Sequence, residues 1–155
     1  MVNIKLLKDM FLRSENTMAV RVKLRISRRS KNISETLIVL VNGSAESEEP
    51  VIAVTPDTAL KLGFSLNDFE LVEVELASGK TYNLISKEKV VLELLDEKGR
   101  VLSTTYAYLT VDDNLTEPLI TDAAIDELGI QVISFKKGLW RHLNDPTNVV
   151  RKSAK

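Results

Sequence analysis

The chain has 155 residues, of which 44% are hydrophobic and 28% are charged, and its formal net charge is -1. These values are typical of one globular domain with a substantial core, and they exclude attraction of the whole molecule to nucleic acid or an anionic membrane. The sequence contains no cysteine and one histidine, His142, which excludes disulfides, thiolate nucleophiles and a histidine-rich metal centre. We therefore expect no metal and no cofactor.

Two further patterns concern localisation. No apolar run approaches the ~20 residues of a membrane span, and no cleavable signal pattern stands at the N-terminus. We expect a cytoplasmic protein without a membrane partner.

The chain divides into three predicted parts. Residues 1–17 form an N-terminal extension in which Ile4, Leu7 and Phe11 fall on one helical face, which indicates a short helix. The alternative is that Met18 is the native start, because a clear strand pattern begins immediately after it. The main domain is predicted over 18–144, and residues 145–155 form a polar C-terminal tail that we expect to be frayed.

The first strand pattern is basic on one face. Apolar and basic residues alternate from Val20 to Ile26, which predicts a half-buried strand, and Arg28, Arg29 and Lys31 continue the charge into a turn. One interpretation is a nucleic-acid-binding ribbon. The absence of interleaved aromatic residues for base stacking favours the other, a solvated sheet edge protected by cations.

The next strand ends abruptly. Glu35 to Val41 is apolar on both faces from Leu37, which predicts a central strand, and it stops at the small polar turn Asn42-Gly43-Ser44-Ala45. Such a stop is typical of a functional group held at the rim of a rigid sheet. Asn42-Gly43 also fits a type I′ hairpin turn, but the acidic segment 46–50 that follows does not alternate as a partner strand would.

Two short helices are expected. The first begins at Thr55-Pro56-Asp57, a good N-cap, first helical residue and first-turn acid, and ends at Gly63. Asp57-Thr58-Ala59 superficially resembles a catalytic tripeptide, but we interpret Asp57 as a helix-start residue. The second helix follows Thr121-Asp122 and stops at Gly129.

The remaining patterns are mainly strands joined by short turns. They cover 51–54, 72–76, 80–85, 90–94, 101–111, 117–120, 130–135 and 138–141, with a tight hairpin at Ser78-Gly79. About eight or nine strands with such spacing predict an all-β barrel, because the turns are too short for the crossovers of a parallel sheet. Trp140 is expected to be a core or interface anchor and His142 a surface histidine.

The order of these elements resembles the retropepsin-like aspartic protease family, in its prokaryotic branch. The resemblance covers residues 19–140. Its anchors are Leu40 to Ala45, the helix with Pro56, Ala59 and Leu62-Gly63, and Pro118 to Asp122 followed by Leu128-Gly129-Ile130. It implies a mainly β fold, a closed acid-protease barrel with two short helices, that works as a homodimer on a peptide or protein substrate.

The family's active site needs Asp-Thr/Ser-Gly at the end of the central strand, one from each subunit, so that two carboxylates share a proton and activate water. By alignment, Asn42 occupies the aspartate position, Gly43 the hydroxyl position and Ser44 the glycine position. An amide can neither share that proton nor act as a general base. The resemblance further implies substrate contacts by Ala45, by a flap turn at Ser78-Gly79, and by Thr121, which stands where the family usually has glycine.

Two sources could return a carboxylate to this position. Glu46 or Glu48 could supply a displaced one, although an acidic surface loop is more often simply solvated. Deamidation of the Asn42-Gly43 dipeptide would instead create an acid at position 42 itself.

Three functions follow from these observations. The first is a retropepsin-like homodimer that is catalytically degenerate or atypical, because Asn42 replaces the catalytic aspartate. The second is a non-catalytic dimeric module that binds a peptide or protein. The third is nucleic-acid binding through the basic strand, which predicts a steep loss of affinity with salt.

Overall fold

The computed structural model describes residues 19–155, except for the side chains of 74–76, so the predicted extension over 1–17 lies outside the described residues. Its elements in chain order are β1 (Arg21–Arg28), η1 (Arg29–Lys31), β2 (Ile33–Val41), β3 (Val51–Val54), α2 (Pro56–Lys61), η2 (Leu66–Asp68), β4 (Phe69–Leu76), β5 (Gly79–Ser86), β6 (Val90–Leu95), β7 (Val101–Val111), β8 (Leu119–Ile120), α3 (Asp122–Glu127), β9 (Ile130–Ser134), β10 (Leu139–His142) and β11 (Arg151–Lys152).

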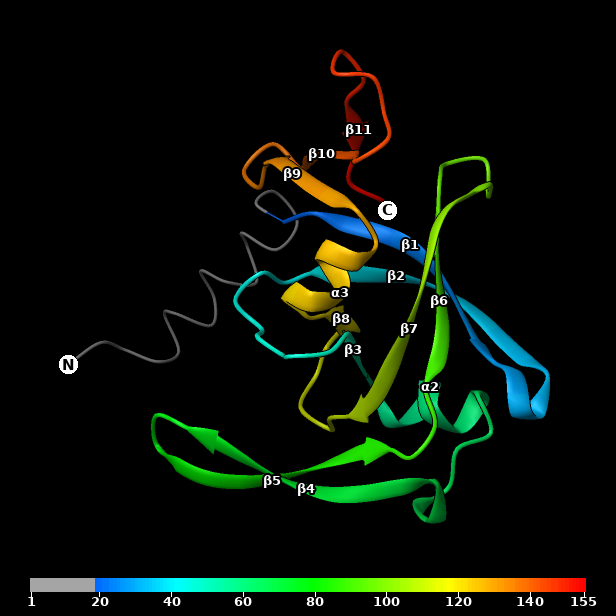
Figure 1. Ribbon diagram of the computed structural model, residues 1–155, viewed down its shortest axis with the longest axis vertical. Helices are drawn as coiled ribbons and strands as arrows, with labels where there is room; N and C mark the ends of the chain where they lie inside the picture. The colour runs from blue at the N-terminus through cyan, green and yellow to red at the C-terminus, as the bar shows by residue number, and fades with distance from the viewer. Residues whose placement is uncertain (1–18) are drawn as a thin grey trace.

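Six strands of the described chain close into a barrel. Their order is β3-β8-β2-β1-β6-β7, and β7 pairs back with β3 (Figure 1). Neighbours are antiparallel except for β2–β8 and β3–β7, which are parallel. Closure removes unpaired edges from these strands. The predicted mainly β barrel with two short helices is confirmed.

The barrel interior is filled by the apolar half of each alternating strand. Val20, Val22, Leu24 and Ile26 are fully buried, which leaves the basic residues of β1 on the outer face. The predicted edge position of this strand is wrong, because β1 lies between β2 and β6. Cationic side chains resemble edge protection in a sequence, but here they are matched by carboxylates on neighbouring segments.

Three arginines of β1 make these ion pairs. Arg21 lies 2.7 Å from Glu117 and Arg25 lies 2.8 Å from Glu93. Arg28 is only 2% exposed, and its partners lie beyond the barrel strands. It donates to Glu88 and to the Gly63 carbonyl, lies 3.2 Å from Asp68, and stacks 4.0 Å over the ring of Phe64. Arg28 therefore joins the end of β1 to the segments that flank α2 and β6.

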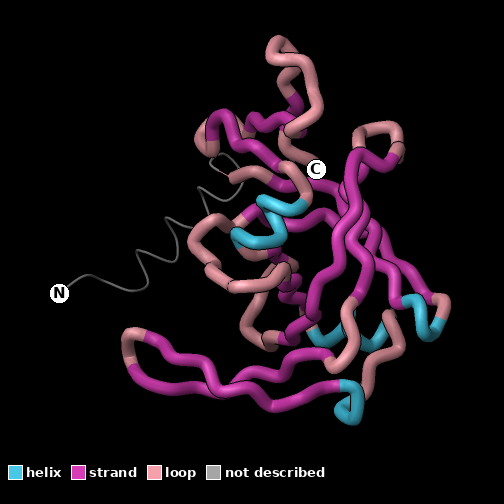
Figure 2. The backbone as a smooth tube through the Cα atoms, viewed as in Figure 1, coloured by secondary structure: helices cyan, strands magenta, loops and turns pink. Residues whose placement is uncertain are grey.

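The hairpin β4–β5 projects from the barrel as a long arm (Figures 1 and 2). Its register runs from Phe69↔Ser86 to Leu76↔Gly79, so the tight turn lies at 77–78, one residue before the predicted Ser78-Gly79. Gly79 has a φ of +129°, a conformation that favours glycine, which explains why the turn could be recognised. The arm joins the barrel at its base, where Ile85 pairs with Thr110.

Helix α2 begins as its cap predicts. Thr55 is the N-cap of α2 and accepts a hydrogen bond from Thr58 N–H, with Pro56 as the first helical residue. Asp57 lies in the first turn with a side chain that is 77% exposed, 3.3 Å from Lys61. Its interpretation as a helix-start residue is confirmed. None of the helices in residues 19–155 combines the length and the apolar character needed to cross a bilayer.

The C-terminal segment is ordered, and the prediction of a frayed tail is wrong. β11 pairs with β10, and Ala154 N–H donates to the Arg21 carbonyl at 2.7 Å. Trp140 is buried, as expected, and its indole N–H donates to the Lys152 carbonyl at 3.3 Å. The tail is polar in composition, yet its backbone extends the pairing of β1 and covers Trp140, which composition does not reveal.

His142 is also misplaced by the sequence prediction. It shares a face of β10 with Trp140 and is only 4% exposed, rather than lying at the surface. Its Nδ1 accepts a hydrogen bond from Asn144 N–H at 3.2 Å. Because the hydrogen bond to its buried ring comes from the turn that directly follows it, we interpret His142 as a structural residue.

Candidate functional site

The strand order places two turns side by side at one rim of the barrel. β2 and β8 are parallel, with Leu40 opposite Leu119 and Val41 opposite Ile120. Both strands therefore end at the same edge, where Asn42 follows β2 and Thr121 follows β8. The rim position predicted for Asn42 is where the structure places it.

Asn42 begins a hydrogen-bonded turn. Ala45 N–H donates to the Asn42 carbonyl at 3.1 Å, and the Asn42 side-chain Oδ1 accepts from Ser44 N–H at 3.2 Å and from Ser44 Oγ at 2.7 Å. The side chain thus folds over the following peptide as an Asx-turn. The type I′ alternative is wrong, because Gly43 does not have positive φ and because β2 and β3 each pair with β8 rather than with one another.

The loop from Asn42 to Pro50 is tied to the start of α3. Ser47 N–H donates to Asp122 Oδ1 at 2.9 Å, and Ser47 Oγ donates to Thr121 Oγ1 at 2.6 Å. In return, Asp122 N–H donates to the Ala45 carbonyl at 2.9 Å. The Thr121 hydroxyl also receives Val51 N–H at 3.2 Å, so it fastens the loop instead of capping the helix.

The residues predicted as site positions fall in two places. Asn42, Gly43, Ser44 and Ala45 lie together in the turn, and Thr121 lies buried beside their loop. Ser78 and Gly79 lie at the end of the projecting β4–β5 arm. No hydrogen bond within residues 19–155 joins that end of the arm to the Asn42 turn.

The carboxylates near the turn already have structural roles or face solvent. Glu46 and Glu48 are exposed, and Glu49 lies 3.0 Å from Lys89. Asp122, which the sequence marked only as a helix-start residue, uses Oδ1 to accept from both Ser47 N–H and Ala123 N–H. No sequence pattern marked it as a contact of the Asn42 loop, because Ser47 and Asp122 lie 75 residues apart in the chain. Within the described residues, no three metal-ligating side chains gather into a cluster.

Two surface hollows lie elsewhere, on either side of the C-terminal tail. One, of about 780 Å³, is lined by Ala19, Glu117 and Leu139; the other, of about 640 Å³, is lined by Leu95, Trp140 and Val150. Arg21, Ile38 and residues 152–155 border both. Neither includes the Asn42 turn, so the hollows are a property of the docked tail and the rim is a separate surface.

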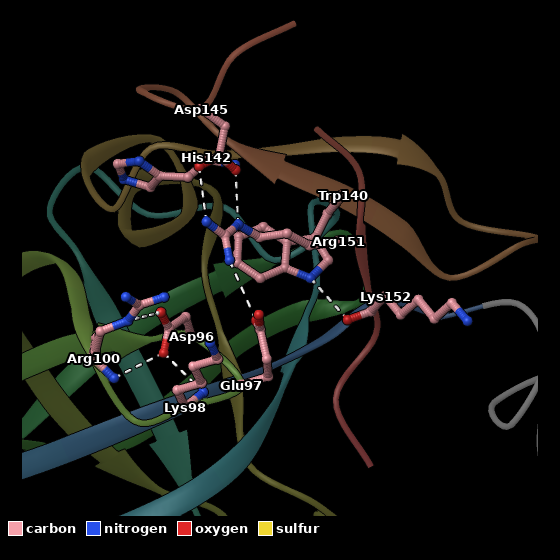
Figure 3. A network of polar contacts seen from close by, with 9 residues as sticks. All are labelled: Asp96, Glu97, Lys98, Arg100, Trp140, His142, Asp145, Arg151 and Lys152. Atoms are coloured by element: carbon pink, nitrogen blue, oxygen red, sulfur yellow. Dashed lines mark hydrogen bonds and ion pairs between the residues drawn. The ribbon is translucent and has the colours of Figure 1, made fainter. Parts of the chain in front are cut away.

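A polar network fixes the tail beside the second hollow (Figure 3). Arg151 donates to both carboxylate oxygens of Asp145, at 2.7 and 2.8 Å, and lies 3.4 Å from Glu97. The hydrogen bond from Arg151, together with that from His142 N–H, lowers the pKa of Asp145 to about 2, although partial burial opposes the shift. The guanidinium also lies 5.7 Å from the Trp140 ring. These are supports of the fold, since they hold the tail over the core.

Comparison with known proteins places the architecture. No family model and no curated protein matches the chain. Among solved structures, a retropepsin-like aspartic protease from Rickettsia conorii is similar, with a TM-score of 0.50 and 15% identity over 74% of this chain and 76% of that chain. The chain has a retropepsin-like fold. At this level of identity the likeness concerns the fold alone.

Proposed function

We propose that this protein is a retropepsin-like homodimer that binds a peptide or protein in its central cleft and is catalytically silent while residue 42 is asparagine. One observation supports the proposal: Asn42, an amide, directly follows β2 at the barrel rim, and the resemblance to retropepsin-like proteases aligns this position with the catalytic aspartate. Two facing carboxylates can share a proton because they cannot both ionise at short distance, whereas two amides hold no such proton.

The local contacts support the loss of chemistry. The Asn42 side-chain oxygen Oδ1 is occupied by both donors of Ser44, and the side-chain nitrogen can only donate. Asp122, beside the same loop, is committed to Ser47 and Ala123. Asn42 is therefore held as part of a structural turn, and its amide cannot activate water by general base catalysis.

The homodimer is part of the proposal because one chain supplies one such turn. A cleft built from two turns needs a two-fold axis, and a symmetric pair of identical chains is the commonest assembly. We expect light scattering to give the mass of two chains at micromolar concentration. A monomer throughout the accessible concentration range would remove the basis for a shared cleft.

Nucleic-acid binding receives less support. Arg25 and Arg28 of β1 are paired with carboxylates, so their charges are compensated within the molecule. Phosphate binding would have to break these pairs, which lowers the gain in affinity from counterion release.

The experiment compares freshly purified wild-type protein with Asn42→Asp and Asn42→Ala in peptide cleavage from acid to neutral pH, beside peptide binding measured on an immobilised library. We expect the wild type and Asn42→Ala to bind peptides without cleaving them, and Asn42→Asp to cleave at acid pH. Cleavage by the wild type that Asn42→Ala abolishes would contradict the proposal. So would the absence of both binding and cleavage in all three proteins.

A further inference from the structure

We propose that Asn42-Gly43 is a self-modifying site at which the folded chain converts its own asparagine side chain to a carboxylate. The chemistry depends only on the turn described above. Its consequence for catalysis rests on the proposed function, because that function places residue 42 in the cleft of the dimer.

The reaction consumes one water and releases one ammonia. The deprotonated backbone nitrogen of Gly43 attacks Cγ of Asn42, and the side-chain nitrogen leaves as ammonia to give a five-membered cyclic imide. Water then opens the imide at either carbonyl, which leaves an aspartate or an isoaspartate at position 42. No oxidant, reductant or further reactant is required.

Gly43 meets the steric requirement for this attack. It is exposed, and a Cβ placed on it would have no atom within 4 Å other than those of its two chain neighbours, so no other segment crowds the residue. Within residues 19–155, Gly43 N–H donates no hydrogen bond. The nitrogen is thus free to lose its proton to solvent and to approach the side chain.

The side-chain oxygen of Asn42 is held by two hydrogen bonds from Ser44. The hydrogen bond from Ser44 N–H folds the side chain over the peptide that joins it to Gly43. Ser44 Oγ donates to the same oxygen at 2.7 Å. Both donors polarise the Cγ carbonyl, and both are placed to stabilise the negative charge that develops on Oδ1 when the nitrogen adds, in the manner of an oxyanion hole.

The product fits the turn as well as the starting residue does. A carboxylate accepts hydrogen bonds at both oxygens, so the two Ser44 donors keep an acceptor after conversion, and bonds to a charged acceptor are stronger. When the imide opens to aspartate, the modification therefore requires no rearrangement of β2 or of the loop. In the proposed homodimer it would place two carboxylates at the positions that the cleft requires.

The chain contains its own reference sites. Asn83, Asn114 and Asn148 are followed by Leu84, Leu115 and Val149, whose side chains crowd the attacking nitrogen. Purified wild-type protein is incubated at neutral pH, and the conversion of each asparagine is followed over time by peptide mass mapping. We expect Asn42 to convert at least about tenfold faster than Asn114, in keeping with an open nitrogen and a preorganised oxyanion site.

Three comparisons test the contribution of the folded geometry. Gly43→Ala, which adds a methyl group in open space, is expected to slow conversion by about tenfold or more while leaving the fold intact. Ser44→Ala, which removes the hydroxyl that makes the shorter of the two hydrogen bonds to Oδ1, is expected to slow the conversion several-fold. Conversion of the wild type in urea is expected to be slower than in the folded state. Equal rates at Asn42 and Asn114, or faster conversion in urea, would overturn the proposal.

The catalytic consequence has a separate readout. Aged wild-type protein, with Asn42 converted, is assayed for peptide cleavage beside fresh protein and Asn42→Asp. We expect cleavage to rise with the converted fraction. If Asn42→Asp cleaves peptides but converted wild-type protein does not, the link between conversion and catalysis is wrong. If Asn42→Asp is inactive and no peptide binding is found, the proposed function itself is wrong.

Discussion

At the scale of single residues, the turn at position 42 depends on one hydrogen-bond acceptor. The turn requires an acceptor for the two donors of Ser44, and the Asn42 amide oxygen provides it. A carboxylate would satisfy the same donors. The turn can therefore be kept intact with either an asparagine or an aspartate at position 42.

Asp145 provides a prediction on pH dependence. Its pKa is lowered from an ordinary 3.8 to about 2 in the folded protein, chiefly by the hydrogen bond from Arg151. A lowered pKa stabilises the fold above the ordinary value, and this stabilisation disappears as the pH falls toward the folded value. We expect Asp145→Asn to lose on the order of 2 kcal/mol at neutral pH, measured by urea unfolding.

The difference between wild type and Asp145→Asn should narrow as the pH falls below about 4 and vanish near the folded pKa. Asp57→Asn is the matched control, because Asp57 pairs with Lys61 on an exposed helix surface, where solvent screens the interaction. We expect Asp57→Asn to change the free energy of unfolding far less. A difference for Asp145→Asn that stays constant between neutral and acid pH would contradict the assignment.

At the scale of elements, the start of α3 holds the loop that carries Asn42. Asp122 accepts Ser47 N–H, and removing this acceptor leaves a donor of the loop without its partner. We expect Asp122→Ala to increase hydrogen exchange at Ser47 by about tenfold, which corresponds to about 1.4 kcal/mol, a typical net hydrogen bond. Amide-resolved exchange measured by NMR checks this.

Asp122→Asn keeps an oxygen that can accept the same bond, so it should retain most of the protection at Ser47. An amide far from the loop, such as that of Leu92 inside the barrel, should be unchanged in both variants. Equal exchange in Asp122→Ala and Asp122→Asn would mean that the carboxylate oxygen does not order the loop.

Elements of this fold could be predicted from sequence wherever their determinants are local. The alternation in β1, and the caps Thr55 and Asp57 of α2, depend on residues a few positions apart, and the structure bears them out. Pairing partners are determined by contacts between distant segments. That is why β1 was assigned to an edge, and why the burial of His142 was not foreseen.

The same distinction between local patterns and distant contacts applies to the candidate site. The position of Asn42 at the end of a buried strand follows from local pattern, and the structure places it at the rim. The contacts of Thr121 and Asp122 with Ser47 join segments far apart in the chain, so no local pattern announced them. Sequence could therefore locate the turn but not the contacts that hold it.

At the scale of the whole molecule, the C-terminal tail stabilises the barrel. Arg151 compensates Asp145, and Ala154 extends the pairing of β1 through Arg21. Removal of residues 149–155 would leave the carboxylate without its cation and uncover Trp140. We expect a loss on the order of 3 kcal/mol in urea unfolding, as for a broken, largely desolvated pair.

Removal of Lys155 alone is the matched control, since the contacts described above all lie before it. We expect that shorter truncation to leave the unfolding midpoint unchanged. If removal of 149–155 also left the unfolding midpoint unchanged, the tail would not stabilise the barrel and the interpretation of its contacts would be wrong.

The pairing of β3 affects the order of folding. Its partner strands lie far along the chain, since Val51 pairs with Tyr108 and Ile52 pairs with Ile120. Pairings between such distant segments carry a large loop-closure cost and slow folding. We expect the hairpins β1–β2, β4–β5 and β6–β7 to form first and β3 to close the barrel last. The turn at Asn42 lies in the connection to β3, so it acquires its final geometry in that last step. The proposed conversion of Asn42, which depends on this geometry, would therefore start only when folding is complete.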